Sequence, residues 1–125
     1  MEILSIDISP KTPLVKFNAQ DGKLEFRGRS IPENSIEFYT PIFDWIDKYS
    51  IQPKGETNVN IQLEYFNTSS SKCLLDIFKK LQSLHTSNKS KVTVTWFYEE
   101  DDEDMLEAGE DYQAIIKVPF VMSKI

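Results

Sequence analysis

The stretch Leu63-Glu64-Tyr65-Phe66-Asn67-Thr68-Ser69-Ser70-Ser71-Lys72 joins an alternating strand to an amphipathic helix, and the rest of the chain is organised around it. Before the junction, one face of the predicted strand carries the apolar residues Val59, Ile61, Leu63 and Tyr65. After it, residues at helical spacing form one apolar stripe, namely Leu74, Ile77, Phe78, Leu81 and Leu84. The pattern therefore predicts a strand over 57–66 and a helix that continues to His85.

Asn67 to Ser71 are predicted to lie at a helix N-terminus, on the rim where the strand ends. Unpaired backbone N–H groups and the positive end of the helix dipole favour an anion there. A hydroxyl in this place can cap the helix, or it can carry a phosphate whose charge the helix partly offsets. Both interpretations remain open from these residues alone.

Size and composition predict a single domain over residues 1–125, with a 40% share of hydrophobic residues that suits a packed core. No apolar run approaches membrane-spanning length, and the N-terminus lacks the pattern of a signal peptide. Cys73 is the only cysteine, which fits a reducing cytoplasm. Its position in the first turns of the predicted helix suits a small helix residue more than a reactive thiol.

The net charge of −6 is unevenly distributed along the chain. Nine acids and no base lie between Glu99 and Asp111, whereas the remainder carries 11 acids and 14 bases. This asymmetry argues against binding along a nucleic-acid backbone, which needs a basic face. The run could be a solvated loop, could recognise a basic protein partner, or could bind a divalent cation, although it lacks the spacing of an EF-hand loop.

Four further strands and two further helices are predicted in chain order. Residues 1–12 are expected to be irregular, and strands follow at 13–18 and 23–29 around an Asp21-Gly22 turn. Ser30 or Asn34 is expected to cap a helix containing Ile36, Tyr39, Ile42, Phe43, Ile46 and Tyr49. Pro41 either bends this helix, which we favour, or stands at the start of a separate one. A strand at 91–98, a helix from about Asp102 and a short edge strand at 118–121 complete the chain.

This order predicts an α/β fold with a mixed sheet of about four to five strands. A parallel, right-handed crossover is expected between strands 57–66 and 91–98 because a helix joins them. Both strands then end on the same rim. We therefore expect Asn67 and Thr68 to share one edge of the molecule with Glu99 to Asp102.

No catalytic constellation emerges from the remaining residues. His85, the only histidine, is expected to be exposed at a helix end, and no glycine-rich phosphate loop or CxxC or HExxH pattern is present. Trp45 and Trp96 are expected in the core, and Arg27 and Arg29 in solvent. A small metal-dependent enzyme that uses the acidic run is the alternative from a different functional class.

Several stretches in order carry a resemblance to a known family. They are Thr12-Pro13; Gly28-Arg29-Ser30-Ile31-Pro32-Glu33-Asn34; Phe43-Asp44-Trp45; the junction Leu63 to Lys72; Trp96 to Met105; and Glu107-Ala108-Gly109-Glu110-Asp111-Tyr112. Over nearly its full length the chain resembles the SiaC family of bacterial regulatory phosphoproteins. That family is similar in architecture to STAS-type anti-sigma-factor antagonists, which implies a small sheet with helices mainly on one face.

The resemblance implies a non-enzymatic switch without a cofactor. A Ser/Thr kinase would phosphorylate Thr68, a PP2C-type phosphatase would reverse this, and the unphosphorylated form would bind a diguanylate cyclase and promote cyclic-di-GMP synthesis and biofilm formation. Ser69, Ser70 and Ser71 are alternative acceptors. The expected partner surface comprises Asn67, Thr68, Ser69, Ser70, Lys72, Glu99, Asp101 and Asp102, with no nucleic acid, metal or direct membrane contact. An anti-sigma-factor antagonist that acts on transcription is the alternative output.

Overall fold

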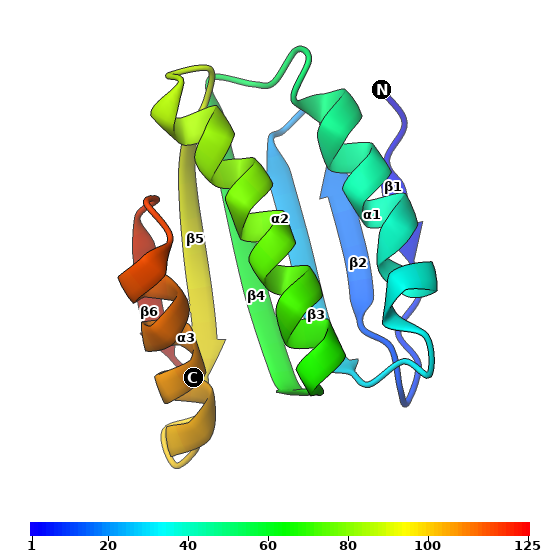
Figure 1. Cartoon of the computed structure of the whole chain (residues 1–125), viewed down its shortest axis with the longest axis vertical. Coiled ribbons are helices and arrows are strands. Elements are labelled where there is room, and N and C mark those ends of the chain that lie inside the picture. The colour runs from blue at the N-terminus through cyan, green and yellow to red at the C-terminus, as the bar shows by residue number, and fades with distance from the viewer.

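Strand β4, Glu56–Phe66, lies in the middle of the chain and of its sheet in the computed structural model, which describes all 125 residues (Figure 1). The other strands are β1 (Leu4–Ile6), β2 (Leu14–Asn18), β3 (Lys23–Ser30), β5 (Lys91–Tyr98) and β6 (Phe120–Lys124). The helices are α1 (Ser35–Tyr49), α2 (Thr68–Thr86) and α3 (Glu103–Ile115).

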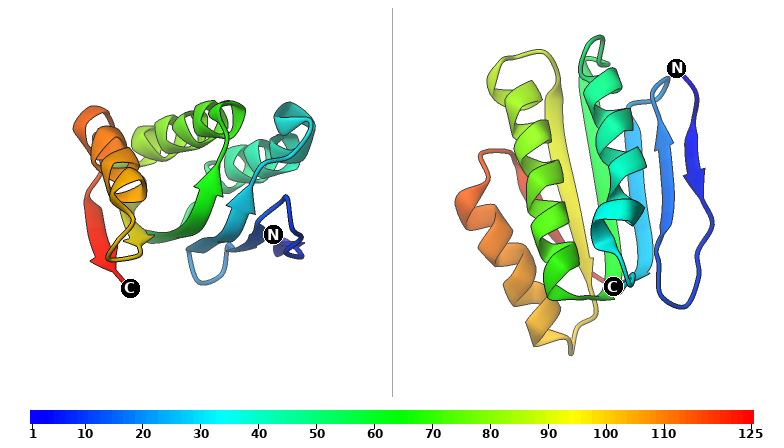
Figure 2. Two further views of the ribbon diagram at one scale, coloured as in Figure 1. Left: turned by 90° about the horizontal axis from the view of Figure 1, so that it is seen from below. Right: turned by 45° about the vertical axis from the view of Figure 1, so that its right-hand side comes forward.

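The six strands form one mixed sheet whose spatial order equals their order in the chain. β1, β2 and β3 pair antiparallel, whereas β3, β4, β5 and β6 pair parallel. Each parallel connection runs through a helix, and the three helices lie on the same side of the sheet (Figure 2). The predicted α/β class, the parallel pairing of β4 with β5 and the one-sided helical layer are therefore confirmed.

The strand count differs from the prediction because β1 lies within residues expected to be irregular. Ser5 pairs with Lys16, so this segment forms an edge strand against β2. Three residues are too few for alternation to identify a strand, and pairing with a neighbour supplies the missing hydrogen bonds. The last strand also starts later than predicted, at Phe120 rather than Val118.

Helix α1 is continuous through Pro41, and its N-cap is Asn34. The Asn34 Oδ1 accepts the backbone N–H of Glu37 at 3.1 Å, which satisfies one unpaired donor of the first turn. The prediction of one helix is confirmed, and the split at Thr40 is wrong. Ile36, however, is 67% exposed, so it does not belong to the apolar stripe of this helix.

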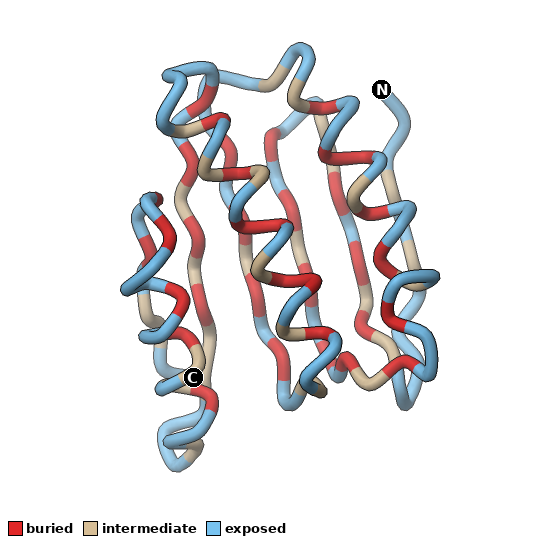
Figure 3. Tube along the Cα trace, viewed as in Figure 1, coloured by how far each residue is buried: buried red, intermediate tan, exposed pale blue.

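The core lies between the helical layer and the covered face of the sheet, and buried residues recur along both the helices and the strands (Figure 3). Trp96 is fully buried and Trp45 nearly so, as predicted. Aromatic rings pack edge to face around them, for example Phe17 against Trp45 at 5.1 Å between centroids. This contact packs helix α1 against strand β2.

A bulge near the end of β4 reverses which side chains face the core. Gly28 of β3 is opposite Leu63, but Arg29 is opposite Tyr65, so β4 carries one extra residue. Phe66 consequently packs against Trp96, with 6.1 Å between the ring centroids, whereas Tyr65 is 58% exposed. The prediction that Tyr65 shares the face of Val59, Ile61 and Leu63 is wrong for this reason.

His85 also differs from its prediction, because it is only partly exposed. Its Nδ1 accepts the backbone N–H of Val92 at 3.1 Å, which ties the end of α2 to β5. Arg27 and Arg29 are exposed, as expected. None of the three helices is both long and apolar enough to cross a membrane.

Candidate functional site at the start of helix α2

The turn from β4 into α2 consists of a single residue, Asn67, which is the N-cap of the helix. Its backbone N–H donates to the carbonyl of Ser30 at 3.0 Å, and its Oδ1 accepts the backbone N–H of Ser70 at 2.9 Å. The cap is therefore Asn67, and no hydroxyl is needed for that role. Thr68 becomes the first residue of the helix.

The Thr68 hydroxyl differs from the three that follow it, because Oγ1 makes no hydrogen bond within the chain and the residue is exposed. Ser69 is exposed too, but its Oγ bonds Ser35 Oγ at 2.6 Å and donates to Asn67 Oδ1 at 3.2 Å. The half-buried Ser71 donates its hydroxyl to the Thr68 carbonyl at 2.7 Å. Thr68 is thus the hydroxyl whose modification breaks no existing contact.

Ser70 is fully buried, which corrects its place among the expected surface residues. Its Oγ lies 2.8 Å from Ser30 Oγ and donates to the Ser30 carbonyl at 3.0 Å, and Ser30 Oγ also bonds Tyr39 Oη at 2.6 Å. Burial raises the pKa of Tyr39 to about 12, with the Ser30 hydrogen bond acting in the opposite direction. These groups join β3, α1 and α2 inside the core.

The first turns of α1 and α2 lie side by side, because the bond between Ser35 and Ser69 joins them. Further along, Lys80 of α2 pairs with Asp47 of α1 at 2.6 Å and lies over the ring of Phe43. Both helices present their positive ends at the same edge of the molecule. The first turn of α2 contains no acid, and the nearest following base is the exposed Lys72.

On the other side of Thr68, the end of β4 and the start of α3 form a groove of about 380 Å³. It is lined by Glu64, Tyr65, Phe66, Asp102, Asp104, Met105 and Ala108. Asp102 caps α3 by accepting the backbone N–H of Met105 at 3.0 Å, and Tyr112 Oη donates to the Ser71 carbonyl at 2.8 Å. The acidic run and the hydroxyl turn therefore meet at one edge, as the parallel topology predicted.

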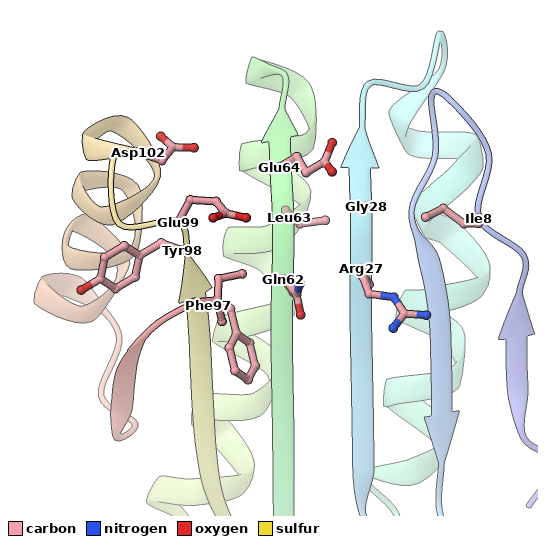
Figure 4. A pocket seen from close by; sticks show the side chains of 11 residues that line it. Ile8, Arg27, Gly28, Gln62, Leu63, Glu64, Phe97, Tyr98, Glu99 and Asp102 are labelled. Atoms are coloured by element: carbon pink, nitrogen blue, oxygen red, sulfur yellow. The ribbon is translucent and has the colours of Figure 1, made fainter.

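A second hollow, of about 290 Å³, opens beside this groove at the ends of β3, β4 and β5. Figure 4 shows Glu64, Glu99 and Asp102 near the strand ends, with Arg27 on β3. Arg29 pairs with Glu64 at 2.9 Å on the same edge. Asp101 is exposed and lines neither hollow.

This geometry does not assemble a nucleophile with a general base. His85 lies at the opposite end of α2, and the Cys73 thiol is buried, which raises its pKa. No three carboxylate, thiol or imidazole groups converge as metal ligands. What the edge offers is a surface that contains one accessible, unbonded hydroxyl.

Two exposed apolar residues near Thr68 were missed by the sequence analysis. Tyr65 projects outward because of the bulge, and Ile36 follows Ser35 in the first turn of α1. Both were assigned to apolar stripes, since periodicity does not report a bulge or the end of a buried stripe. The only signal was their place beside predicted turns.

Comparison with known proteins places this geometry in a family. A family model described as SiaC family regulatory phosphoprotein matches residues 6–125. An uncharacterized protein of Pseudomonas aeruginosa (strain UCBPP-PA14), PA14_02130, is 30% identical over 122 residues, which cover 98% of this chain and 96% of that protein.

Solved structures agree with this assignment. The crystal structure of apo-SiaC from Pseudomonas aeruginosa superposes with a TM-score of 0.90 at 29% identity, covering 98% of this chain and 99% of that one. SiaC in a crystal structure of the diguanylate cyclase SiaD in complex with its activator SiaC gives a TM-score of 0.92 at 29% identity and the same coverage.

Proposed function

Since the chain belongs to the SiaC family of regulatory phosphoproteins, we propose that it is a non-enzymatic switch whose phosphate acceptor is Thr68. A Ser/Thr kinase adds the phosphate and a PP2C-type phosphatase removes it. The unphosphorylated form binds and activates a diguanylate cyclase, and so raises cyclic-di-GMP in the cytoplasm. The whole chain acts as one regulatory domain.

The observation that carries this proposal is the state of the Thr68 hydroxyl. It is exposed, it forms no hydrogen bond, and it stands at the positive end of a helix that Asn67 already caps. A phosphate adds about −1.5 to −2 charges at neutral pH, and a helix N-terminus tolerates them. The modification therefore leaves the core intact and changes the surface.

The cyclase as partner is supported by the relative from Pseudomonas aeruginosa, SiaC, which is the activator in a complex with the diguanylate cyclase SiaD. A partner that covers the start of α2 removes water from Thr68. A phosphate in that position would be desolvated by the partner, which costs several kcal/mol and releases the partner. Asp102 and Asp104 in the neighbouring groove add like charge to the same edge.

The test combines site mapping with binding. Mass spectrometry of the protein from its own cells, with and without phosphatase treatment, is expected to find a removable phosphate on Thr68. Thr68→Ala should retain cyclase binding and Thr68→Asp should lose it, whereas Thr86→Asp, an exposed threonine at the far end of α2, should bind like the unchanged protein. Equal binding by Thr68→Ala and Thr68→Asp contradicts the proposal. Recovery of an anti-sigma factor in place of the cyclase would favour an output in transcription.

A further inference from the structure

We propose that Ile36 and Tyr65 are the apolar anchors of the cyclase-binding surface, and that this surface receives a cyclase segment with an apolar centre and basic flanks. We refer to Ile36, Tyr65, Thr68 and Ser69 as the Thr68 patch. The inference rests on the proposed function and extends it, since it names the surface that the phosphate interrupts and the chemistry of the segment that binds there.

The exposure of the two anchors is the first observation. Ile36 is 67% exposed and Tyr65 is 58% exposed, although the other large apolar side chains of α1 and β4 are buried or partly buried. Each lies beside the Thr68 turn. Tyr65 precedes Thr68 by three residues, and Ile36 follows Ser35, whose hydroxyl bonds Ser69. Binding hot spots are enriched in aromatic side chains, and apolar side chains that are exposed close together mark interaction sites.

The helix geometry puts Ile36 on the side of α1 that faces α2. Ile36, Phe43 and Asp47 share one stripe at helical spacing, and the latter two contact Lys80 of α2. Helices α1 and α2 run parallel and start at the same edge of the molecule (Figure 1). Ile36 precedes Phe43 by seven residues, or about two turns, and therefore lies level with the first turns of α2. Ile36 therefore borders the patch from α1.

Tyr65 borders the patch from the strand side. It lines the groove together with three apolar residues, Phe66, Met105 and Ala108, and three acids, Glu64, Asp102 and Asp104, so its ring belongs to a wall that is both apolar and acidic. The patch itself is uncharged, because Thr68 and Ser69 contribute hydroxyls and Ile36 and Tyr65 contribute apolar side chains.

Two acids, Glu37 and Asp104, and one base, the exposed Lys72, lie near this uncharged patch. Glu37 follows Ile36 in α1, and Asp104 lines the groove beside Tyr65; neither forms an ion pair within the chain. Charge complementarity therefore selects a segment with Lys or Arg on its flanks and apolar residues at its centre. A phosphate on Thr68 would place charge among the uncharged side chains of the patch, against the apolar centre of the segment, where it would lose its solvation. It would abolish binding although the partner is basic.

The experiment measures binding of the purified full-length cyclase to the full-length chain by titration calorimetry, with a matched pair of variants. Ile36→Glu is expected to weaken binding by about tenfold or more. The control is Ile51→Glu, which makes the same change at a residue that is 82% exposed just beyond the other end of α1. It should bind within about twofold of the unchanged protein, as expected outside an interface. Tyr65→Ala tests the second anchor, with a loss of similar size.

Folding does not confound the test, because Ile36 lies in the first turn of α1, where a carboxylate is favourable. Normal phosphorylation of Ile36→Glu by the kinase provides an independent check. If Ile36→Glu and Tyr65→Ala both bind the cyclase normally while Thr68→Asp does not, the assignment of Ile36 and Tyr65 as binding anchors is wrong, whereas the proposed role of Thr68 is retained. If Ile36→Glu slows phosphorylation and leaves cyclase binding unchanged, the patch serves the kinase and the inference is overturned. If Thr68→Asp also binds normally, the proposed function itself fails.

Discussion

A negative charge at position 68 should stabilise the fold, and this prediction separates a surface switch from one that unfolds α2. Thr68→Asp places a carboxylate in the first turn of a helix that has no acid there. The replaced hydroxyl makes no hydrogen bond, so the substitution breaks no existing contact. The dipole interaction contributes about 0.3–1 kcal/mol at an exposed site, and Lys72, four residues on, adds roughly 0.3–0.5 kcal/mol.

Repulsion between the new carboxylate and the acidic groove reduces this stabilisation, so the free energy of unfolding should rise by about 0.5–1 kcal/mol at low salt. The unfolding entropy of a chain of this length is roughly 260 cal/mol/K near the melting temperature, so Tm should rise by about 2–4 °C. Calorimetry or circular dichroism of Thr68→Asp against Thr68→Asn isolates the charge from the change of shape. Enzymatic phosphorylation should raise Tm at least as much, because the phosphate carries more charge.

The same charge two residues later should have the opposite effect. Ser70 is fully buried and bonded to Ser30, so Ser70→Asp should lower the unfolding free energy by at least about 3 kcal/mol. If Thr68→Asp lowers Tm, or if its helical signal falls while cyclase binding is lost, the switch acts by unfolding α2. The reasoning from the unbonded hydroxyl would then be refuted.

Three further outcomes follow from the packing. Gly109→Ala should lower stability by about 1–3 kcal/mol and alter Trp96 fluorescence, since a Cβ would lie 2.5 Å from the indole; Gly55→Ala, with open space, is the control. Burial raises the pKa of Tyr39 from its ordinary value of 10 to about 12, so its contribution to the free energy of unfolding is complete below pH 10 and is lost as pH rises towards 12. In denaturant titrations at a series of pH values, the free energy of unfolding of Tyr39→Phe should therefore fall less steeply between pH 10 and 12 than that of the unchanged protein. Cys73, buried and with a raised pKa, should react with Ellman's reagent only after unfolding, and rapid reaction of the native chain would contradict this.

The sequence alone determined the junction of strand and helix, the parallel crossover that follows it and the meeting of Thr68 with the acidic run at one edge. The strand and the helix follow from the periodicity of consecutive residues. The parallel crossover follows from the general rule for two strands joined by a helix, so neither feature requires knowledge of distant contacts. The same is true of α1, whose apolar spacing outweighed Pro41 in predicting one helix. The resemblance carried by the junction and its neighbouring stretches pointed to the family that the comparisons then showed.

Only the tertiary structure distinguished the four hydroxyls, because their difference lies in partners distant in sequence. Ser70 is buried by Ser30 and Tyr39, and Ser69 is bonded to Ser35, whereas Thr68 is left exposed and unbonded. The exposure of Tyr65 likewise depends on one extra residue opposite β3, and a bulge of that kind leaves no mark on a pattern of period two. Burial and pairing are properties of the packed sheet and helices, so they appear only when segments remote in the chain are brought together.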